Sequence, residues 1–459
     1  MNNARRTILL GCLGLASIPV YAINFRVAPI LVKANLISSS GAPFVSFLYQ
    51  VTVLAIIYLI ALRCVLRWEA ADRQNGAVFV ILFFAIVFRL LLVPGRPVLS
   101  TDIYRYVWDG RVQAHGINPY RYPPADKALR SLQDKDIYSR MNRQASPTIY
   151  PAGAQLLFRA LNGLKRDSIS GIKGADALFD TGSVLVLMAI LSSLGMARER
   201  ALIYAWHPLV VFECASSGHL DGFMLFFVLL SFLLMIRKRT IASLGSLALA
   251  ASLKLYPAII LPAVLKEKKL RGLLVFSIVF LSLYLPYIGV GKKIVGFLPQ
   301  YFENPDQSFN LGLKAYLEKL LPNTNPLVWT GLFAAILLCA AGWIWISHKD
   351  TCAALRFSYY LTALPIVFTA SSLQPWYMLW IIPFLAIFPS PAWFYLSFAV
   401  CLSYLAYAPG QMLPGWEWVR FVEYVPFFVL LAAQVLAQRK SKAGWFPWET
   451  REKRQTSEF

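Results

Sequence analysis

GAVFVILFFAIVFRLLLVPG (residues 76–95) leads directly towards STDIYRYVWDGRVQAHGINPYRYPP (residues 100–124). The first run is apolar and, at about 20 residues, long enough to cross a bilayer core as a helix. The second run is polar and aromatic, with two acids, three arginines, one histidine and five aromatic residues. Nothing in it resembles a membrane anchor or a buried core. We therefore expect it to lie beside a membrane and to act on a charged, membrane-held substrate.

The composition extends this pattern to the whole chain. Of 459 residues, 58% are hydrophobic and only 15% are charged, whereas soluble proteins have roughly a quarter charged residues. Recurring apolar runs predict an all-α polytopic membrane protein with about twelve transmembrane helices in one integrated domain, residues 1–438. The net charge of +21 fits anionic lipid and positive-inside loops rather than nucleic acid. Six scattered cysteines without a CxxC pair suggest neither a disulfide framework nor a zinc site.

Charge placement predicts the orientation of these helices. The expected spans are residues 7–27, 46–65, 76–95, 176–195, 201–217, 220–236, 272–289, 327–347, 353–370, 375–388, 391–407 and 420–437. The arginine and lysine clusters between them fall on one side if both termini, including a basic tail at 439–459, are cytoplasmic. The outer face then carries residues 96–175, the corner 217–220, and the segments 290–326, 371–374 and 408–419.

Residues 240–265 do not fit a simple crossing, because basic clusters flank both ends and Lys254 and Pro257 interrupt the middle. We expect a re-entrant pair of half-helices; one kinked span is the alternative.

The first outer loop is itself basic, with nine Lys/Arg and five Asp/Glu between residues 96 and 150. Binding of a phosphate-bearing lipid would explain this exception to the positive-inside rule. Residues 151–164 read as an amphipathic surface helix.

Asp102 follows the third expected span by a few residues, where a carboxylate can take a proton from an attacking hydroxyl group. The plain alternative is that Ser100, Thr101 and Asp102 cap a helix beginning at Ile103. Arg105 and Arg111 are candidates to clamp a phosphate, because the planar guanidinium binds such oxygens bidentately. A solvated basic loop beside anionic lipid is equally compatible with these arginines. Tyr104 places an aromatic ring next to them.

Two further clusters carry polar and aromatic groups at the expected outer interface. In WHPLVVFECASSGHLDG (206–222), Glu213, His219 and Asp221 are ionisable groups near a tight corner, where such groups are usually functional or paired; Asp221 could also simply cap the next helix. In SSLQPWYMLW (371–380), Gln374, Trp376 and Tyr377 could stack on and hydrogen-bond to a sugar. An ordinary aromatic belt is the alternative. Asn310 is a lone polar candidate in the second outer loop.

Several nucleotide- and metal-binding motifs are missing. The chain has no Walker A loop and no GxGxxG after a strand, and its first outer loop has no pair of acids that we expect to bind a metal. Asp134 and Asp136 come nearest to such a pair but sit in a plainly hydrophilic stretch. We therefore expect no cofactor, and a divalent metal has no support from the sequence.

Five runs occur in an order that resembles a known family: TDIYRYVWDGRVQAHGINPYRYPP, TIYPAGAQLLF, YAWHPLVVFECASSGHLDG, ASLKLYPAIILP and SSLQPWYMLWIIPFLA. They resemble bacterial polytopic glycosyltransferases of the GT-C superfamily, close to polyprenyl-phosphate-mannose-dependent mannosyltransferases and glycosyltransferase family 87. The resemblance covers most of residues 76–390. Here the first outer acid comes after three expected spans, whereas many relatives have it after the first.

The resemblance implies a hexosyltransferase of the bacterial inner membrane that works on the outer face. It would move a hexose, with mannose expected, from a polyprenyl-phosphate donor to a glycolipid or glycan acceptor with inversion. Asp102 would be the general base, with Asp109 or Asp221 as substitutes. His219 and Asp221 would shape the donor or acceptor pocket. The candidate substrate-binding residues are Tyr104, Arg105, Arg111, Asn118, Tyr120, Tyr150, Glu213, Lys254, Asn310, Gln374, Trp376 and Tyr377.

Two other functions compete with this interpretation. A lipid or polysaccharide transporter or flippase would place broken helices near mid-membrane, as residues 240–265 do, but would also show repeated halves, and none is evident. A polysaccharide polymerase or ligase uses similar lipid-linked sugars. It would need a large outer loop late in the chain, where residues 408–419 form only a short one.

Overall fold

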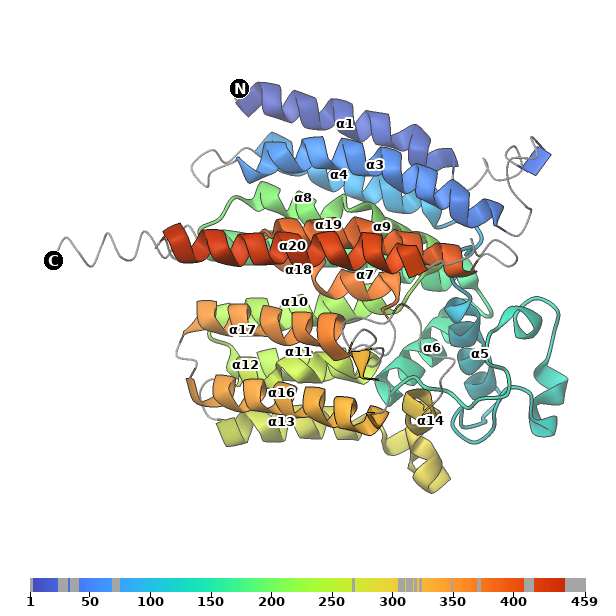
Figure 1. Ribbon diagram of the computed structural model, residues 1–459. Helices are drawn as coiled ribbons and strands as arrows, with labels where there is room; N and C mark the ends of the chain where they lie inside the picture. Colours follow the sequence, from blue (N-terminus) through green and yellow to red (C-terminus); the bar gives the residue numbers. More distant parts are fainter. Residues whose placement is uncertain are drawn as a thin grey trace.

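The structure is a computed structural model, and it describes residues 3–23, 32–33, 41–67, 75–265, 269–303, 310, 317, 320–321, 324–347, 350–369, 373–407 and 417–441. Within these ranges the secondary structure is helical, and the longer helices lie side by side along one common direction (Figure 1). The expected all-α architecture is confirmed to this extent. Most of the outer segment 408–419 and of the tail 439–459 falls outside the described residues.

The first half of the chain builds the upper layers of Figure 1 and the polar end of the bundle. Its helices are α1 (Asn3–Ile23), α3 (Ala42–Leu66), α4 (Asn75–Leu92), α5 (Asp102–Ala114), η2 (Lys127–Leu132), η3 (Tyr138–Arg140), α6 (Ala152–Leu164), α7 (Ile169–Ser193), η4 (Arg198–Ala201), α8 (Leu202–Ala205), α9 (Pro208–Val211), η5 (Phe212–Ser217) and α10 (Asp221–Ile236).

The second half packs below and across this group. Its helices are α11 (Thr240–Leu253), η6 (Tyr256–Ile260), α12 (Leu261–Val264), α13 (Lys269–Ser282), η7 (Leu285–Val295), α14 (Leu298–Glu303), α16 (Pro326–Ser347), α17 (Thr351–Leu364), η9 (Pro365–Thr369), η10 (Pro375–Trp380), α18 (Ile382–Leu385), α19 (Pro391–Ala399), η11 (Val400–Tyr407) and α20 (Glu417–Ser441).

The expected count of about twelve spans is not confirmed. Among the described residues, five helices are long and apolar enough to cross a membrane: Ala4–Ile23, Ala42–Leu66, Asn75–Leu92, Ile169–Ser193 and Trp418–Ala437. A sixth would be the pair Lys269–Ser282 and Leu285–Gln300, which is bent by 88°. The straight span expected at 272–289 is therefore broken, and Pro286 lies in the first turn of the second piece, where proline tolerates the missing N–H. Several other expected spans form apolar helices of 10–17 residues.

The expected single span at 201–217 is also broken into short pieces. His207 has extended backbone angles and Pro208 begins α9, because proline pushes the residue before it out of the helical region. A π-helix, η5, then ends at Gly218, whose φ of 69° lies in the left-handed region. This region favours glycine, and a Cβ there would also lie 2.6 Å from Ile103. The breaks turn Glu213 and His219 towards the polar end of the bundle.

Residues 240–265 run out and back. α11 leaves the C-terminal end of α10, and Lys254 at its far end reaches Asp221 at the N-terminus of α10. The chain then returns through η6 and α12, and a Cβ on Gly272 of α13 would touch both Leu244 and Leu265. The start of α11 and the end of α12 therefore lie together. The path out and back agrees with the expected re-entrant pair of half-helices. The position of this pair relative to a bilayer stays a prediction.

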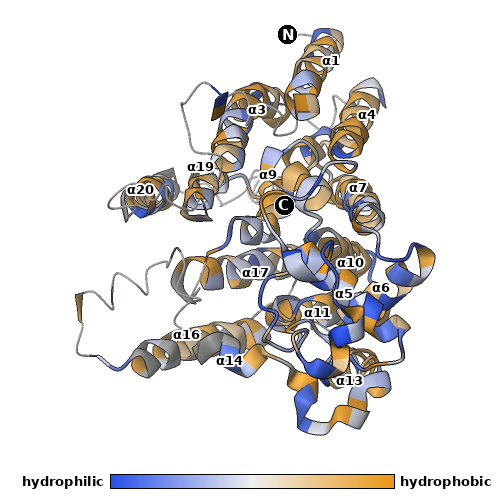
Figure 2. Cartoon of the chain, turned by 90° about the vertical axis from the view of Figure 1, so that its right-hand side faces the viewer, coloured by the Kyte–Doolittle hydropathy of each residue, from blue (hydrophilic) through white to orange (hydrophobic). Residues whose placement is uncertain are grey.

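The two ends of the bundle differ in polarity. Asn3 and Ser441 lie at the same end, while α5, α6 and α14 lie at the other (Figure 1). At the first end Arg6 donates to the carbonyl of Arg67, and Arg198 donates to Asn75, so several of the expected inside clusters gather there. Figure 2 looks onto the opposite end, where hydrophilic residues collect on α5, α6 and the segments that join them.

A buried ion pair joins three helices in the apolar interior. Arg89 Nε of α4 lies 2.6 Å from Asp180 Oδ2 of α7, and Arg89 Nη1 also donates to the carbonyl of Ala205. The hydroxyl of Tyr204 donates to Asp180 as well. Both charged side chains are at most 2% exposed. Such a pair adds little to the free energy of unfolding compared with a pair of apolar side chains of the same size. Removing one partner, however, leaves a buried charge without compensation.

We expect Arg89→Leu to lower the free energy of unfolding by about 3–5 kcal/mol, because Asp180 would lose its counter-charge in an apolar site. The double variant Arg89→Leu/Asp180→Leu should lose less than the two single variants do together. Thermal unfolding in detergent measures both effects, with Arg63→Leu on the exposed face of α3 as the control. Additive losses in the double variant would contradict the assignment.

Candidate active site

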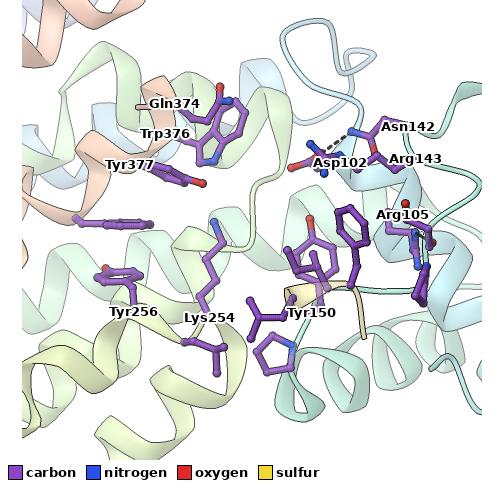
Figure 3. Close-up of a pocket in the computed structure, with 18 residues that line it drawn as sticks. Asp102, Arg105, Asn142, Arg143, Tyr150, Lys254, Tyr256, Gln374, Trp376 and Tyr377 are labelled. Carbon is purple, nitrogen blue, oxygen red and sulfur yellow. Dashed lines mark hydrogen bonds between the residues drawn. The ribbon is translucent and has the colours of Figure 1, made fainter. Parts of the chain in front are cut away.

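A cavity of about 460 Å³ opens at the polar end of the bundle. Its walls come from α5, from the segment after η3, from the turn between α11 and η6, from the start of α14 and from η10 (Figure 3). Seven of the expected site residues line it: Asp102, Arg105, Tyr150, Lys254, Gln374, Trp376 and Tyr377. Groups separated by more than 270 positions in the chain therefore share one space.

Asp102 is the first residue of α5, and its side chain points into the cavity. The helix is preceded by Thr101, which makes no side-chain capping hydrogen bond. Asp102 Oδ1 accepts a hydrogen bond of 2.9 Å from Asn142 Nδ2, and Oδ2 lies 3.9 Å from His219 Nε2. The alternative in which Asp102 caps a helix from Ile103 is therefore wrong. The carboxylate is available to a ligand.

His219 and Glu213 form a buried pair behind Asp102. His219 Nδ1 lies 2.7 Å from Glu213 Oε2, and the hydroxyl of Tyr404 donates to the other oxygen of Glu213. The imidazole ring packs on Trp376 with 4.3 Å between the ring centroids. Neither His219 nor Glu213 lines the cavity, so they can act on a ligand only through Asp102 or Trp376.

Asp221 is fully buried and joins two walls of the cavity. It accepts hydrogen bonds from Lys254 Nζ at 2.5 Å and from Trp380 Nε1 at 2.8 Å. The residue before α10 is Leu220, which has no side-chain cap, so Asp221 does not serve as the helix cap that the plain alternative described. With both oxygens engaged, it orients Lys254 and Trp380 rather than a substrate.

Aromatic rings form the wall opposite Asp102, with Lys254 reaching into the space between (Figure 3). Tyr256 stacks on Trp380 with 3.5 Å between ring centroids, and Tyr377 stacks on the same indole at 4.5 Å. Flat aromatic faces bind the apolar faces of sugars and apolar chains, while the indole and phenol groups keep a polar edge.

Asp109 lies away from the cavity and holds the outer loop together. Its Oδ1 pairs with Arg105 Nε at 2.8 Å, and its Oδ2 accepts from Thr148 Oγ1 and Gln155 Nε2. The side chain is 2% exposed. Such a saturated carboxylate has no lone pair facing a ligand, so a substitute role as base has no support. Arg105 still borders the cavity, but Asp109 already neutralises its charge.

Arg111 also serves the loop. Its guanidinium pairs with Asp134 at 2.8 Å and with Asp167 at 3.1 Å, and it donates to the carbonyl of Leu132. It does not line the cavity, so the phosphate clamp expected for it has no support from this geometry.

Four other candidates form the frame around the cavity. Asn118 donates to the carbonyl of Tyr287 in η7, and Tyr120 donates to the carbonyl of Tyr150. Tyr104 is buried in the core. Asn310 donates to Glu423 Oε2 at 2.6 Å and lies against the carbonyl of Leu373, next to Gln374 but outside the cavity. These residues can position the site without touching a ligand.

The sequence analysis missed eleven of the eighteen residues that line the cavity, among them Asn142, Arg143, Tyr256 and Trp380. Tyr256 and Trp380 belong to the ASLKLYPAIILP and SSLQPWYMLW runs, so extending those clusters would have found them. Asn142 and Arg143 carry no local signal, because they sit in a hydrophilic stretch about forty residues from Asp102. Arg143 has a φ of 52°, which is uncommon for a residue other than glycine, and its guanidinium lies over Phe297 at 5.6 Å.

Among the residues that the structure describes, no group of three His, Cys, Asp or Glu side chains could hold a metal ion.

Comparison with known proteins identifies the family. The model of the MptA_B family (Alpha-(1->6)-mannopyranosyltransferase, N-terminal domain) matches residues 7–266, more than half of the 459 residues. The chain belongs to this family. The expected resemblance to membrane mannosyltransferases is thereby confirmed. No curated protein and no solved structure matches the chain. The matched region includes Asp102, Arg143, His219 and Lys254, whereas the aromatic residues of η10 lie beyond it.

In this member of the mannosyltransferase family, the segment that joins η2 and η3 holds a carboxyl group, that of Asp134, with a displaced pKa. Partial burial alone would raise the pKa of Asp134. Hydrogen bonds from the backbone N–H groups of Tyr138 and Ile137, together with Arg111, outweigh burial, so the pKa lies below its usual value. Because the pKa is lower in the folded state, the ionised carboxylate stabilises the fold. This stabilisation is fully present above the unfolded pKa of about 3.9 and is lost as pH falls through the folded pKa.

We expect the protection of residues 127–140 from hydrogen exchange to fall as pH drops below about 4. Asp134→Asn should reduce protection at neutral pH and remove that part of the acid dependence. Asp136→Asn, an exposed neighbour, is the control. An Asp134→Asn protein with the same pH dependence as the parent would show that other groups hold the loop.

Proposed function

We propose that this protein transfers mannose from a polyprenyl phosphate to a hydroxyl group of a lipid- or glycan-linked acceptor, with Asp102 as general base. Membership of a mannosyltransferase family supports sugar transfer. The observation that carries the proposal is the position of Asp102, whose carboxylate faces a cavity bordered by cations and aromatic rings. The reaction would take place at the outer face of a bacterial inner membrane, with both termini cytoplasmic.

The reaction is a single displacement. The acceptor oxygen attacks the anomeric carbon while Asp102 takes the hydroxyl proton. The bond between the anomeric carbon and the phosphate oxygen breaks, and the lipid phosphate leaves with the electron pair. Because attack comes from the face opposite the leaving group, the configuration at the anomeric carbon inverts. The sugar arrives already activated, so this chemistry needs no nucleotide-binding fold.

Fixed cations would stabilise the negative charge that develops on the leaving phosphate. Lys254 and Arg143 border the cavity on different walls. Lys254 is oriented by Asp221 and is 17% exposed, so the ammonium group is held in place yet remains in reach of a ligand. Arg143 is exposed on the loop side and offers the planar donors that suit phosphate oxygens.

The geometry also weighs against transport as the main function. The broken segment 240–265 was the feature that favoured a transporter. The break falls at Lys254, which contacts Asp221 and borders the same cavity as Asp102. The irregular backbone therefore supplies a binding group at the polar end of the bundle, as a sugar-transfer site requires.

We expect Asp102→Asn to lower kcat at least about a hundredfold, because asparagine keeps the size but cannot take a proton. The assay incubates purified protein with radiolabelled polyprenyl-phosphate mannose, glucose, arabinose or galactose and a lipid extract. Asp136→Asn, an exposed acid of the same loop, is the matched control. Transfer at the parent rate by Asp102→Asn would remove Asp102 from the role of base.

We expect Arg143→Ala to raise the KM for the polyprenyl-phosphate donor about tenfold or more, because a charge-assisted contact to phosphate is worth roughly 1.5–3 kcal/mol. Arg130→Ala removes an exposed arginine of the same loop outside the cavity and should leave the donor KM unchanged. A donor KM that responds equally to both substitutions would indicate general attraction of anionic lipid instead.

A further inference from the structure

His219 carries a buried nitrogen atom that has no hydrogen-bond partner. Its side chain is 1% exposed, and Nε2 is among the described buried polar atoms without a hydrogen bond. Buried nitrogen atoms are nearly always paired, and an exception calls for a physical explanation. The nearest carboxylate atom is Asp102 Oδ2 at 3.9 Å, which is too far for a hydrogen bond.

The other side of the ring determines which nitrogen carries the proton. Glu213 accepts from Tyr404 through one oxygen and lies 2.7 Å from His219 Nδ1 through the other. An ionised carboxylate can only accept, so Nδ1 bears the hydrogen. In a neutral imidazole, Nε2 is then a lone pair aimed at the carboxylate of Asp102. Two acceptors face each other, and the gap between them lacks one proton.

We propose that this gap is the destination of the proton that the reaction releases, so that Asp102 and His219 work as a relay. The inference rests on the proposed function, because Asp102 must first act as base. The acceptor hydroxyl gives its proton to Asp102 Oδ2 as the bond to the anomeric carbon forms. The protonated Oδ2 becomes a donor, approaches Nε2 and passes the proton to it.

The relay balances charge at each stage. Each transfer moves the proton from one group to a neighbouring lone pair and creates no free proton. The resulting imidazolium lies against the carboxylate of Glu213. Asp102 returns to its anionic form, in the cavity whose cations, Lys254 and Arg143, balance the leaving phosphate. After the product leaves, the proton returns through Asp102 to water in the cavity. His219 touches no substrate and acts only through Asp102.

The charged and titratable groups around His219 come from four elements. Asp102 of α5 and Glu213 of η5 face the two ring nitrogens. Behind Glu213 lie Tyr404 and Cys401 of η11. Lys173 of α7 comes near Gly218 but its ammonium group is bound by the carbonyls of Leu92 and Gly95. The ring face is covered by Trp376, which does not titrate.

The test compares pH profiles of His219→Gln with the parent protein, with radiolabelled polyprenyl-phosphate mannose as donor. Glutamine fills the space and can hydrogen-bond but cannot take a proton. We expect kcat to fall at least about tenfold with an unchanged donor KM. The parent's kcat should fall on the acid side of the pH profile, since a proton already on Nε2 blocks the relay. In His219→Gln that fall should move to lower pH.

Glu213→Gln offers a second readout if His219→Gln does not fold. Loss of the carboxylate behind the ring should lower kcat and move the acid-side fall in the same direction. His207→Gln removes another fully buried histidine of the same segment, one that is bonded to Ser397, and should keep the parent's profile.

The outcomes separate the relay from the proposed function. An active Asp102→Asn protein would overturn both. An inactive Asp102→Asn protein beside a His219→Gln protein with the parent's kcat and pH profile would overturn the relay alone. A rise in donor KM without a change in the profile would also overturn it, because His219 would then only shape the pocket through Trp376. The relay would also be overturned if His207→Gln changed the pH profile as much as His219→Gln does.

Discussion

The ion pair between Asp221 and Lys254 is the interaction on which the site depends. It joins the N-terminus of α10 to the break between α11 and η6, and the second oxygen of Asp221 binds Trp380 of η10. Three segments that are far apart in the chain thereby meet at one buried carboxylate. Because Asp221 is fully buried, losing either partner would leave its charge or a lone pair unmatched. The pair holds the aromatic wall and the cationic group of the cavity in register.

The segment between α4 and α6 uses several of its charges on its own structure. Asp109 satisfies Arg105, Thr148 and Gln155, and Arg111 bridges Asp134 and Asp167. A loop that lacks strands or long helices must satisfy its polar groups through such side-chain contacts. This network fixes the start of α5 and therefore the place of Asp102. Arg105 and Arg111 therefore serve the structure of this segment.

Behind the cavity, the broken segment 201–217 places side chains where a straight helix could not place them. The π-helix η5 and the left-handed Gly218 bring Glu213 and His219 to the same side, so that one ring nitrogen meets Glu213 and the other faces Asp102. Irregular helices of this kind expose backbone groups, and the close packing around them keeps those groups paired. The same irregularity explains why the number of long apolar helices is smaller than hydropathy predicts.

The sequence by itself determined that the chain is helical and apolar, that polar chemistry gathers in a few short runs, and that Asp102, Lys254 and the residues around Trp376 are candidates for one site. These features are local, because hydrophobic length and residue type are written in consecutive positions. The sequence could not separate Asp102 from Asp109, or Arg143 from Arg111, since each pair shares residue type and loop. Only the tertiary structure decided which member is saturated by neighbours and which faces the cavity, because hydrogen-bond and ion-pair partners 39 to 56 positions away make that choice.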